Sequence, residues 1–170
     1  SASAIGCDFK NILNDPETPE TARQLFNHAA KYTEEPLAYF DQLNSRNPEK
    51  SAFYFRVITN SYAFADGAFA EGLGNLGKEY IENYPGNFAA FFDHTSCFTD
   101  TDLKTWAQIA LLEFEIIDDQ IESGSGEPLV NIYSNHLLAK SQSLPLSQQE
   151  TIRKFTIYLK NSWGDFLKNI

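Results

Sequence analysis

The sequence predicts an all-α fold, in which residues 1–170 form a single domain of six to eight helices. Apolar residues recur at spacings of three and four along most of the chain, and no stretch alternates as a surface strand does. Proline and cap residues mark where successive helices begin. At 170 residues and 42% hydrophobic composition, the chain can bury about two-thirds of its unfolded surface. We expect a multi-helix bundle or a short α-solenoid of helical hairpins.

The first half of the chain divides into four segments. Residues 1–15 are a lead-in with a short apolar helix, part of which is interpreted as a remnant of processing or cloning. A Thr-Pro-Glu start predicts a helix over residues 18–33, and a proline near residue 36 opens a short helix to residue 45. The longest helical pattern covers residues 47–85, and it is interpreted as one helix or as two with a break near Asp66-Gly67.

The second half shows equally clear boundaries. A short aromatic helix covers residues 88–92. Threonine and aspartate residues then open the clearest helix, over residues 99–122, and a Ser-Gly-Ser-Gly loop follows it. Two more amphipathic helices are predicted over residues 128–142 and 147–167.

Small residues form a second stripe beside the apolar face of the longest pattern. Glycine inside a helix costs up to about 1 kcal/mol per position, so three glycines on one face need a reason. Close approach of another helix, a helix break and room for a ligand all remain open. The stripe consists of Ala63, Gly67, Ala70, Gly74 and Gly77.

The chain is strongly acidic, with a net charge of −10 and a pI near 4.6. Such a charge repels phosphate backbones, so the sequence argues against a nucleic-acid partner and favours a basic protein partner. No apolar run approaches the roughly 18 residues that a membrane span needs. No sequence pattern indicates a cofactor.

The N-terminal residues suggest an exported protein, periplasmic or secreted. Ala2-Ser3-Ala4 has the small-x-small pattern of a signal peptidase site. Cys7 and Cys97 are the only cysteines, and an even count in an exported chain predicts a disulfide. Alternatively, Ala-Ile-Gly-Cys is a relaxed lipoprotein box and Cys7 carries a lipid anchor. The two alternatives exclude each other, because both use the sulfur of Cys7.

Four carboxylates lie at helical offsets of 0, 3, 4 and 7, so the sequence predicts one acidic stripe formed by Glu115, Asp118, Asp119 and Glu122. Oxygen ligands of this kind suit Ca²⁺ or Mg²⁺, although such a stripe beside a core face is more typical of a solvated or partner-binding surface. We assign it to binding and not to a metal.

A second group of candidate binding residues lies in the longest pattern. Asp66 follows Tyr62 by four residues, which predicts that Asp66 lies within the apolar face and needs a hydrogen-bond partner, for example by capping a second helix at a break. Glu71 is not on the same face as Asp66 if the helix is continuous. If the chain forms a pocket at this point, we expect Tyr62, Asp66 and Glu71 to line it.

No nucleophile elbow, P-loop, dinucleotide fingerprint or zinc-protease motif occurs, so the sequence favours a non-enzymatic function. Size, charge and helical architecture indicate an exported protein that binds a protein partner through an acidic, aromatic-rich helical surface. A small inhibitor or an immunity-type protein would be an example. The alternative is a small-molecule or metal-dependent activity in a pocket around the glycine and aromatic residues of 62–77.

Overall fold

The computed structural model describes residues 6–30, 32–93 and 97–170, and within these ranges it contains helices and no strand. The all-α prediction is therefore confirmed. The expected signal peptidase site at residues 2–4 lies outside the described residues. No helix of the described part is long and apolar enough to cross a membrane.

In the part of the chain that the structure describes, eight α-helices are connected by loops, two 3₁₀ segments and one π segment. The elements are α1 (Lys10–Asn14), α2 (Glu20–Phe26), the 3₁₀ helix η1 (Glu35–Gln42), α3 (Pro48–Ser61), the 3₁₀ turn η2 (Tyr62–Phe64), α4 (Gly67–Asn83), α5 (Pro85–Asp93), α6 (Asp100–Ile116), the π-helical segment η3 (Ile117–Ile121), α7 (Gly126–Ser141) and α8 (Leu146–Lys168).

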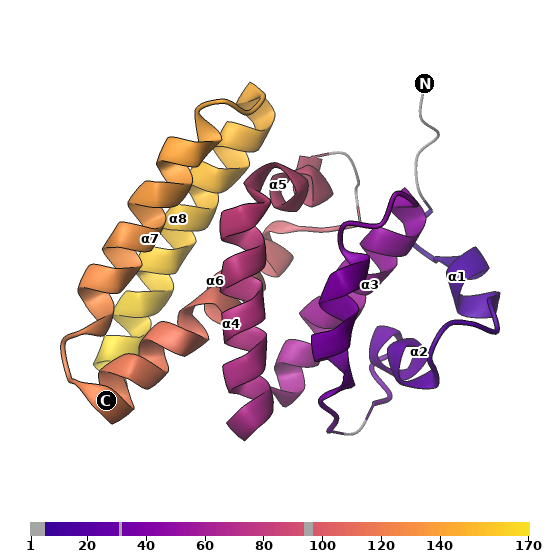
Figure 1. The fold of residues 1–170 in the computed structure, drawn as a ribbon, viewed down its shortest axis with the longest axis horizontal. Coiled ribbons are helices and arrows are strands. Elements are labelled where there is room, and N and C mark those ends of the chain that lie inside the picture. Colours follow the sequence, from indigo (N-terminus) through magenta and orange to yellow (C-terminus); the bar gives the residue numbers. More distant parts are fainter. Residues whose placement is uncertain (1–5, 31, 94–96) are drawn as a thin grey trace.

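Figure 1 shows the helices arranged in a row. The antiparallel pair α7 and α8 forms one end, α4 and α6 lie in the middle, and α1 to α3 form the other end. The two most extensive helix contacts join helices that are not consecutive in sequence: α4 packs on α6, and α6 packs on α8. Helix α5 also packs on α8. This is the arrangement of an irregular helical bundle.

The longest pattern is two helices and not one. Asn47 caps the first of them, since its Oδ1 accepts hydrogen bonds from the backbone N–H groups of Glu49 and Lys50 at 3.1 and 3.2 Å. The helix α3 ends at Ser61, and α4 begins at Gly67, whose φ of 52° is left-handed. A residue in the left-handed conformation interrupts a helix and changes the direction of the helix that follows. Glycine adopts this conformation without a Cβ clash.

The second helix is shorter than predicted. The expected helix over residues 18–33 ends at Phe26, because His28 adopts a left-handed φ of 56°. The N–H of Ala29 donates a hydrogen bond to the carbonyl of Gln24 at 2.8 Å, and the N–H of His28 donates one to the carbonyl of Leu25 at 3.2 Å. These two bonds form a Schellman motif, which closes a helix C-terminus.

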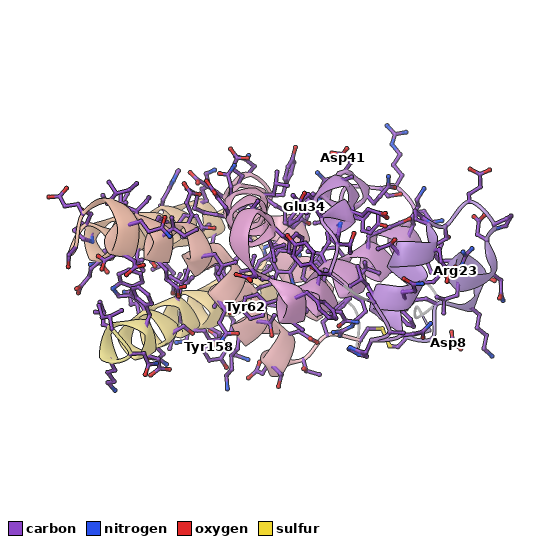
Figure 2. All side chains as sticks on the ribbon, turned by 90° about the horizontal axis from the view of Figure 1, so that it is seen from below. Asp8, Arg23, Glu34, Asp41, Tyr62 and Tyr158 are labelled. Carbon is purple, nitrogen blue, oxygen red and sulfur yellow. A yellow bond between two sulfur atoms is a disulfide. The ribbon has the colours of Figure 1, made fainter. Side chains whose placement is uncertain are left out.

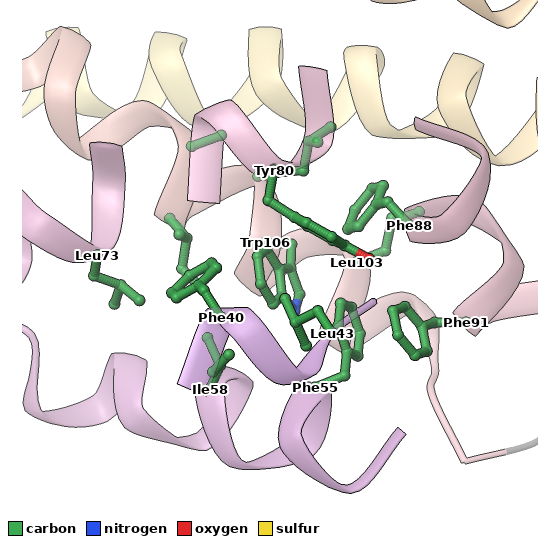
Figure 3. Packing of buried hydrophobic residues seen from close by; sticks show 14 of the residues in the cluster. Phe40, Leu43, Phe55, Ile58, Leu73, Tyr80, Phe88, Phe91, Leu103 and Trp106 are labelled. Atoms are coloured by element: carbon green, nitrogen blue, oxygen red, sulfur yellow. The ribbon is translucent and has the colours of Figure 1, made fainter. Parts of the chain in front are cut away.

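Aromatic rings fill the centre of the core (Figure 3). Phe55 stacks on Trp106 with ring centroids 4.7 Å apart and on Phe91 with centroids 4.1 Å apart. The indole Nε1 of Trp106 donates to Oγ1 of Thr59 at 2.8 Å, so the buried N–H is satisfied. A continuous apolar cluster extends from Phe9 through these rings to the far helix pair.

The small-residue stripe brings α4 and α6 together. A Cβ added at Gly74 would lie 2.7 Å from Cβ of Leu112 and 3.2 Å from the backbone nitrogen of Glu113. A Cβ at Gly77 would lie 2.6 Å from Cγ2 of Ile109. The structure therefore explains the glycines in two ways. Gly74 and Gly77 allow α6 to approach α4 closely, and Gly67 lies at the break between two helices. Side chains and backbone of α6 occupy the space beside Gly74 and Gly77.

Candidate functional site

A shallow acidic hollow lies between α4 and α6, with a volume of about 520 Å³. One face of α4 lines most of it, because positions 68, 71, 72 and 75 follow the helical repeat. The lining residues are Ala68, Glu71, Gly72, Asn75 and, from α6, Glu113. The close approach at Gly74 explains why a residue of α6 reaches this hollow, since Glu113 follows the contact residue Leu112 directly.

The two carboxylates of the hollow differ in their surroundings. Oε2 of Glu113 lies 3.2 Å from Nζ of Lys78, but this oxygen accepts no hydrogen bond, so the contact is an ion pair without good hydrogen-bond geometry. Nζ of Lys78 also lies 5.2 Å from the ring centroid of Phe114. Glu71 is exposed and has no ion-pair or hydrogen-bond partner in the described part of the chain. Its negative charge is therefore available to a ligand.

The 3₁₀ helix η1 lies against α4 beside the hollow. The methyl groups of Leu37 in η1 lie within 2.8 to 3.2 Å of the position that a Cβ on Gly72 would take. Figure 2 shows Glu34 and Asp41 at the upper edge of the molecule in that view. Both acids are exposed, as is Glu71.

An exposed aromatic ring accompanies these acids. Tyr32 is 55% exposed, and its ring packs edge-on against Phe69 of α4 with centroids 6.4 Å apart. We call the surface formed by Tyr32, Glu34, Asp41 and Glu71 the η1–α4 face. Tyrosine is an effective contact residue because it presents a large amphipathic ring at low entropic cost.

Charge is unevenly distributed over the helices. Residues 34–42 and 67–83 together carry six acidic residues and one lysine, a net charge of −5 and thus half of the total of −10. The helix α8 carries four basic and two acidic residues, a net charge of +2. These two segments are therefore more negative than the chain on average.

Tyr62 lies away from this face. In Figure 2 it points to the side opposite Glu34 and Asp41. Burial first, and then the charge of Glu115, raises the pKa of the Tyr62 hydroxyl, while burial raises the pKa of Glu115. Asp66 is exposed and caps α4, accepting a hydrogen bond from the N–H of Gly67 at 2.8 Å. The prediction that Asp66 lies within the apolar face is wrong, because the helix breaks beside it, whereas its capping role matches the expectation for a break.

The four predicted carboxylates do not form one stripe. The α-helix ends at Ile116, and the π-helical turn of η3 changes the direction of the following side chains. Asp118 is buried and turns inward, where its Oδ1 accepts hydrogen bonds from the backbone N–H groups of Gly124 and Gly126 at 2.9 and 3.0 Å. Asp119 and Glu122 are exposed, whereas Glu115 is half-buried. Asp118 therefore has a structural role, because it fixes the loop that leads into α7.

The candidate binding residues that the structure brings together differ from those that the sequence predicts. Of the predicted binding residues, only Glu71 lines the hollow, and its partner there is Glu113. Sequence reasoning missed Glu113, since nothing in its local pattern shows that α6 crosses α4 at Gly74. Among the described residues, no group of three or more histidines, cysteines or carboxylates is placed to hold a metal ion.

Cys7 and Cys97 form a disulfide, with the sulfur atoms 2.11 Å apart. A lipid on Cys7 is incompatible with this bond, because lipidation requires a free sulfur. The segment after Cys97 is held by an arginine that the sequence did not single out. Arg56 donates to the carbonyl of Cys97 at 2.8 Å and to both carboxylate oxygens of Asp102 at 2.8 Å.

The fold and these contacts define an all-α domain with one disulfide in its described part and an acidic hollow between α4 and α6. Comparison with protein-family models, with curated proteins and with solved structures finds no match to this chain. Its function is therefore argued from the geometry and charge of its own residues.

Proposed function

We propose that this protein is a non-enzymatic, exported binding protein whose η1–α4 face docks a basic region of another protein. The observation that carries the proposal is the acidic hollow, where the unpaired carboxylate of Glu71 adjoins Glu113 at the edge of exposed acidic residues. A lysine or arginine side chain of the partner would enter the hollow, and Tyr32 would supply apolar contact beside it. An inhibitor or an immunity-type protein would act in this way.

The charge pattern suits this role. A concentrated negative field steers a basic partner during encounter and mainly accelerates association. The positive charge of α8 disfavours the same approach on that helix, so the partner would meet the protein in one orientation.

The disulfide supports an extracytoplasmic location. Disulfides persist in oxidising compartments and are rare in cytosolic proteins. A periplasmic or secreted protein would therefore keep the Cys7–Cys97 bond. A partner in that compartment, such as a secreted enzyme or toxin, is the class that we expect.

The proposal is tested by capture of the partner from an extract of the source organism, with the full chain immobilised and bound proteins identified by mass spectrometry. We expect capture of a basic protein that weakens as salt rises, since screening shortens the range of exposed charges to about 3 Å at 1 M. The triple variant Glu34→Gln, Asp41→Asn, Glu71→Gln should bind the captured protein at least about tenfold more weakly, mainly through slower association.

A matched control removes the same number of charges elsewhere. Asp119→Asn, Glu122→Gln, Glu127→Gln changes three exposed carboxylates on η3, directly after it and at the start of α7. It should leave the affinity within about twofold of the wild type if only the η1–α4 face is used. Equal losses in both variants would show non-specific charge attraction and contradict the proposal.

A further inference from the structure

The disulfide fastens a short N-terminal segment to the body of the protein. We call residues 6–14 the N-terminal strap. It contains Cys7, the buried ring of Phe9 and the five-residue helix α1. Figure 1 shows it at the α1–α3 end of the row of helices.

The body side of the disulfide is held independently of the bond. Arg56 of α3 fixes the carbonyl of Cys97, and its guanidinium lies 5.0 Å from the ring centroid of Phe98. Asp102 binds the same guanidinium and accepts a hydrogen bond from the N–H of Thr99 at 2.9 Å. Loss of the disulfide would leave these contacts in place, so Cys97 would keep its position.

The strap side is held much less firmly. Phe9 has a left-handed φ of 52°, a conformation that non-glycine residues adopt at an energetic cost, and no side chain caps α1. A helix of five residues is not stable alone in water. The ring of Phe9 packs edge-on against Phe26 and Phe53, with centroids 5.6 and 5.9 Å apart. The strap also has one long, exposed hydrogen bond to α3, from Nδ2 of Asn11 to Oε2 of Glu49 at 3.4 Å.

The far end of the strap is anchored without the disulfide. Oγ1 of Thr18 donates to the carbonyl of Ile12 at 2.6 Å, and Nε of Arg23 donates to that of Leu13 at 2.9 Å. These bonds tie the end of α1 to α2. Without the disulfide, the strap would therefore open about Ile12 and Leu13, with Phe9 on the moving side.

From these contacts we infer that the Cys7–Cys97 bond is a redox-sensitive switch that holds the N-terminal strap on the body of the protein. Its reduction releases the N-terminal strap, withdraws Phe9 and uncovers an aromatic surface on Phe26 and Phe53, while the other helices stay folded. Cys7 is exposed, so a reductant from solvent reaches its sulfur.

The chemistry is a thiol–disulfide exchange with a dithiol. A thiolate of the dithiol attacks the sulfur of Cys7, and the thiolate of Cys97 leaves and takes up a proton. The second thiol of the reductant then displaces Cys7 from the mixed disulfide. The protein gains two electrons and two protons, and the dithiol is oxidised to its own disulfide.

The test is hydrogen exchange with mass spectrometry on the full chain, before and after treatment with dithiothreitol. The amide of Leu13 is the probe, because it donates to the carbonyl of Phe9 at 2.9 Å in the closed strap. After reduction we expect exchange in the strap to be at least about tenfold faster, and at least about tenfold faster than in α6 and α8 of the same sample.

Two variants of the oxidised protein complete the test. Phe9→Ala removes the aromatic contact and keeps the disulfide, so its strap should open less than that of the reduced wild type. Glu17→Gln, at an exposed position just beyond the strap, should not change exchange. The inference is overturned if reduction leaves exchange in the strap unchanged, if the strap and α6 exchange at the same rate in the reduced protein, or if oxidised Phe9→Ala opens fully.

Discussion

Arg56 and Asp102 join α3 to the start of α6 through two parallel hydrogen bonds, each 2.8 Å long. Asp102 is also the N3 residue of the α6 capping box, and its carboxylate accepts a hydrogen bond from the N–H of Thr99. Both side chains are largely shielded from water, with exposed fractions of 21% and 12%. One carboxylate therefore stabilises the first turn of α6 and orients the helix against α3.

Removal of Arg56 should be strongly destabilising. We expect Arg56→Ala to lower the free energy of unfolding by about 2 to 4 kcal/mol, because it leaves the shielded charge of Asp102 without its partner. Urea denaturation measures the loss. Arg153→Ala is the control, since Arg153 pairs with Glu150 at a fully exposed site and its loss should have little effect. Equal stabilities of the two variants would contradict this role of Arg56.

The same pair makes stability depend on pH. Burial alone would raise the pKa of Asp102, but the hydrogen bonds from Arg56 and from the N–H of Thr99 outweigh it and hold the pKa below its ordinary value of 3.8. The ionised form is thus favoured by folding, so this stability is present above about pH 4 and is lost as the pH falls through the folded pKa. Urea titrations from pH 5 to 2 should show a steeper decline for wild type than for Asp102→Asn.

Glu115 should behave in the opposite way. Burial raises its pKa above the ordinary value of 4.5, so its ionisation opposes folding. Stability due to this group falls as the pH rises through 4.5 toward the folded pKa. Glu115→Gln should therefore melt higher than wild type at pH 7, by no more than about 3 °C, and equally at pH 4 or below. A variant that melts lower at pH 7 would show that the ionised carboxylate has an undetected stabilising partner.

The helix contact at Gly74 can be tested with one methyl group. Gly74→Ala would place a Cβ 2.7 Å from Cβ of Leu112, which should cost about 1 to 3 kcal/mol through overpacking. Gly164→Ala in α8 is the matched control, because no atom lies within 4 Å of its added Cβ. It should stabilise the protein by up to about 1 kcal/mol through helix propensity. Thermal melts compare the two, and a neutral Gly74→Ala would disprove the close approach.

The disulfide should also raise global stability. It joins residues 90 positions apart, and the chain-entropy model assigns about 4 to 5 kcal/mol to a loop of this length. Cys7→Ser, Cys97→Ser should lower the free energy of unfolding by about that amount in urea. A loss below about 1 kcal/mol would mean that the unfolded chain is not restricted by the bond.

Local signals predicted where several helices begin. Asn47 followed by proline marks the start of α3, and Thr99 with Asp102 marks the capping box of α6. These signals act within one turn, so they can be read without knowledge of the fold. The end of α2 was missed because histidine occupies the left-handed position where glycine is the usual signal.

The acidic stripe shows where periodicity fails. The prediction assumed 3.6 residues per turn through Glu122, whereas the π turn of η3 adds a residue to the turn and directs Asp118 inward. The N–H groups of Gly124 and Gly126 make this inward position favourable. The Ser-Gly loop, which the sequence predicts to be flexible, thus supplies the backbone N–H donors for a buried carboxylate, and no spacing rule indicates this.

The sequence by itself determined the helical class, the starts of several helices and the negative charge, since each follows from composition or from interactions within a few residues. It left the bond of Cys7 open between a disulfide and a lipid. Tertiary structure decided which acids share a surface. Glu71 and Glu113 meet because α4 and α6 approach closely at Gly74, while Tyr62 and Glu115 lie elsewhere. Such pairings depend on how two helices cross, and the crossing joins residues that are about 40 positions apart in the sequence, so no local pattern indicates it.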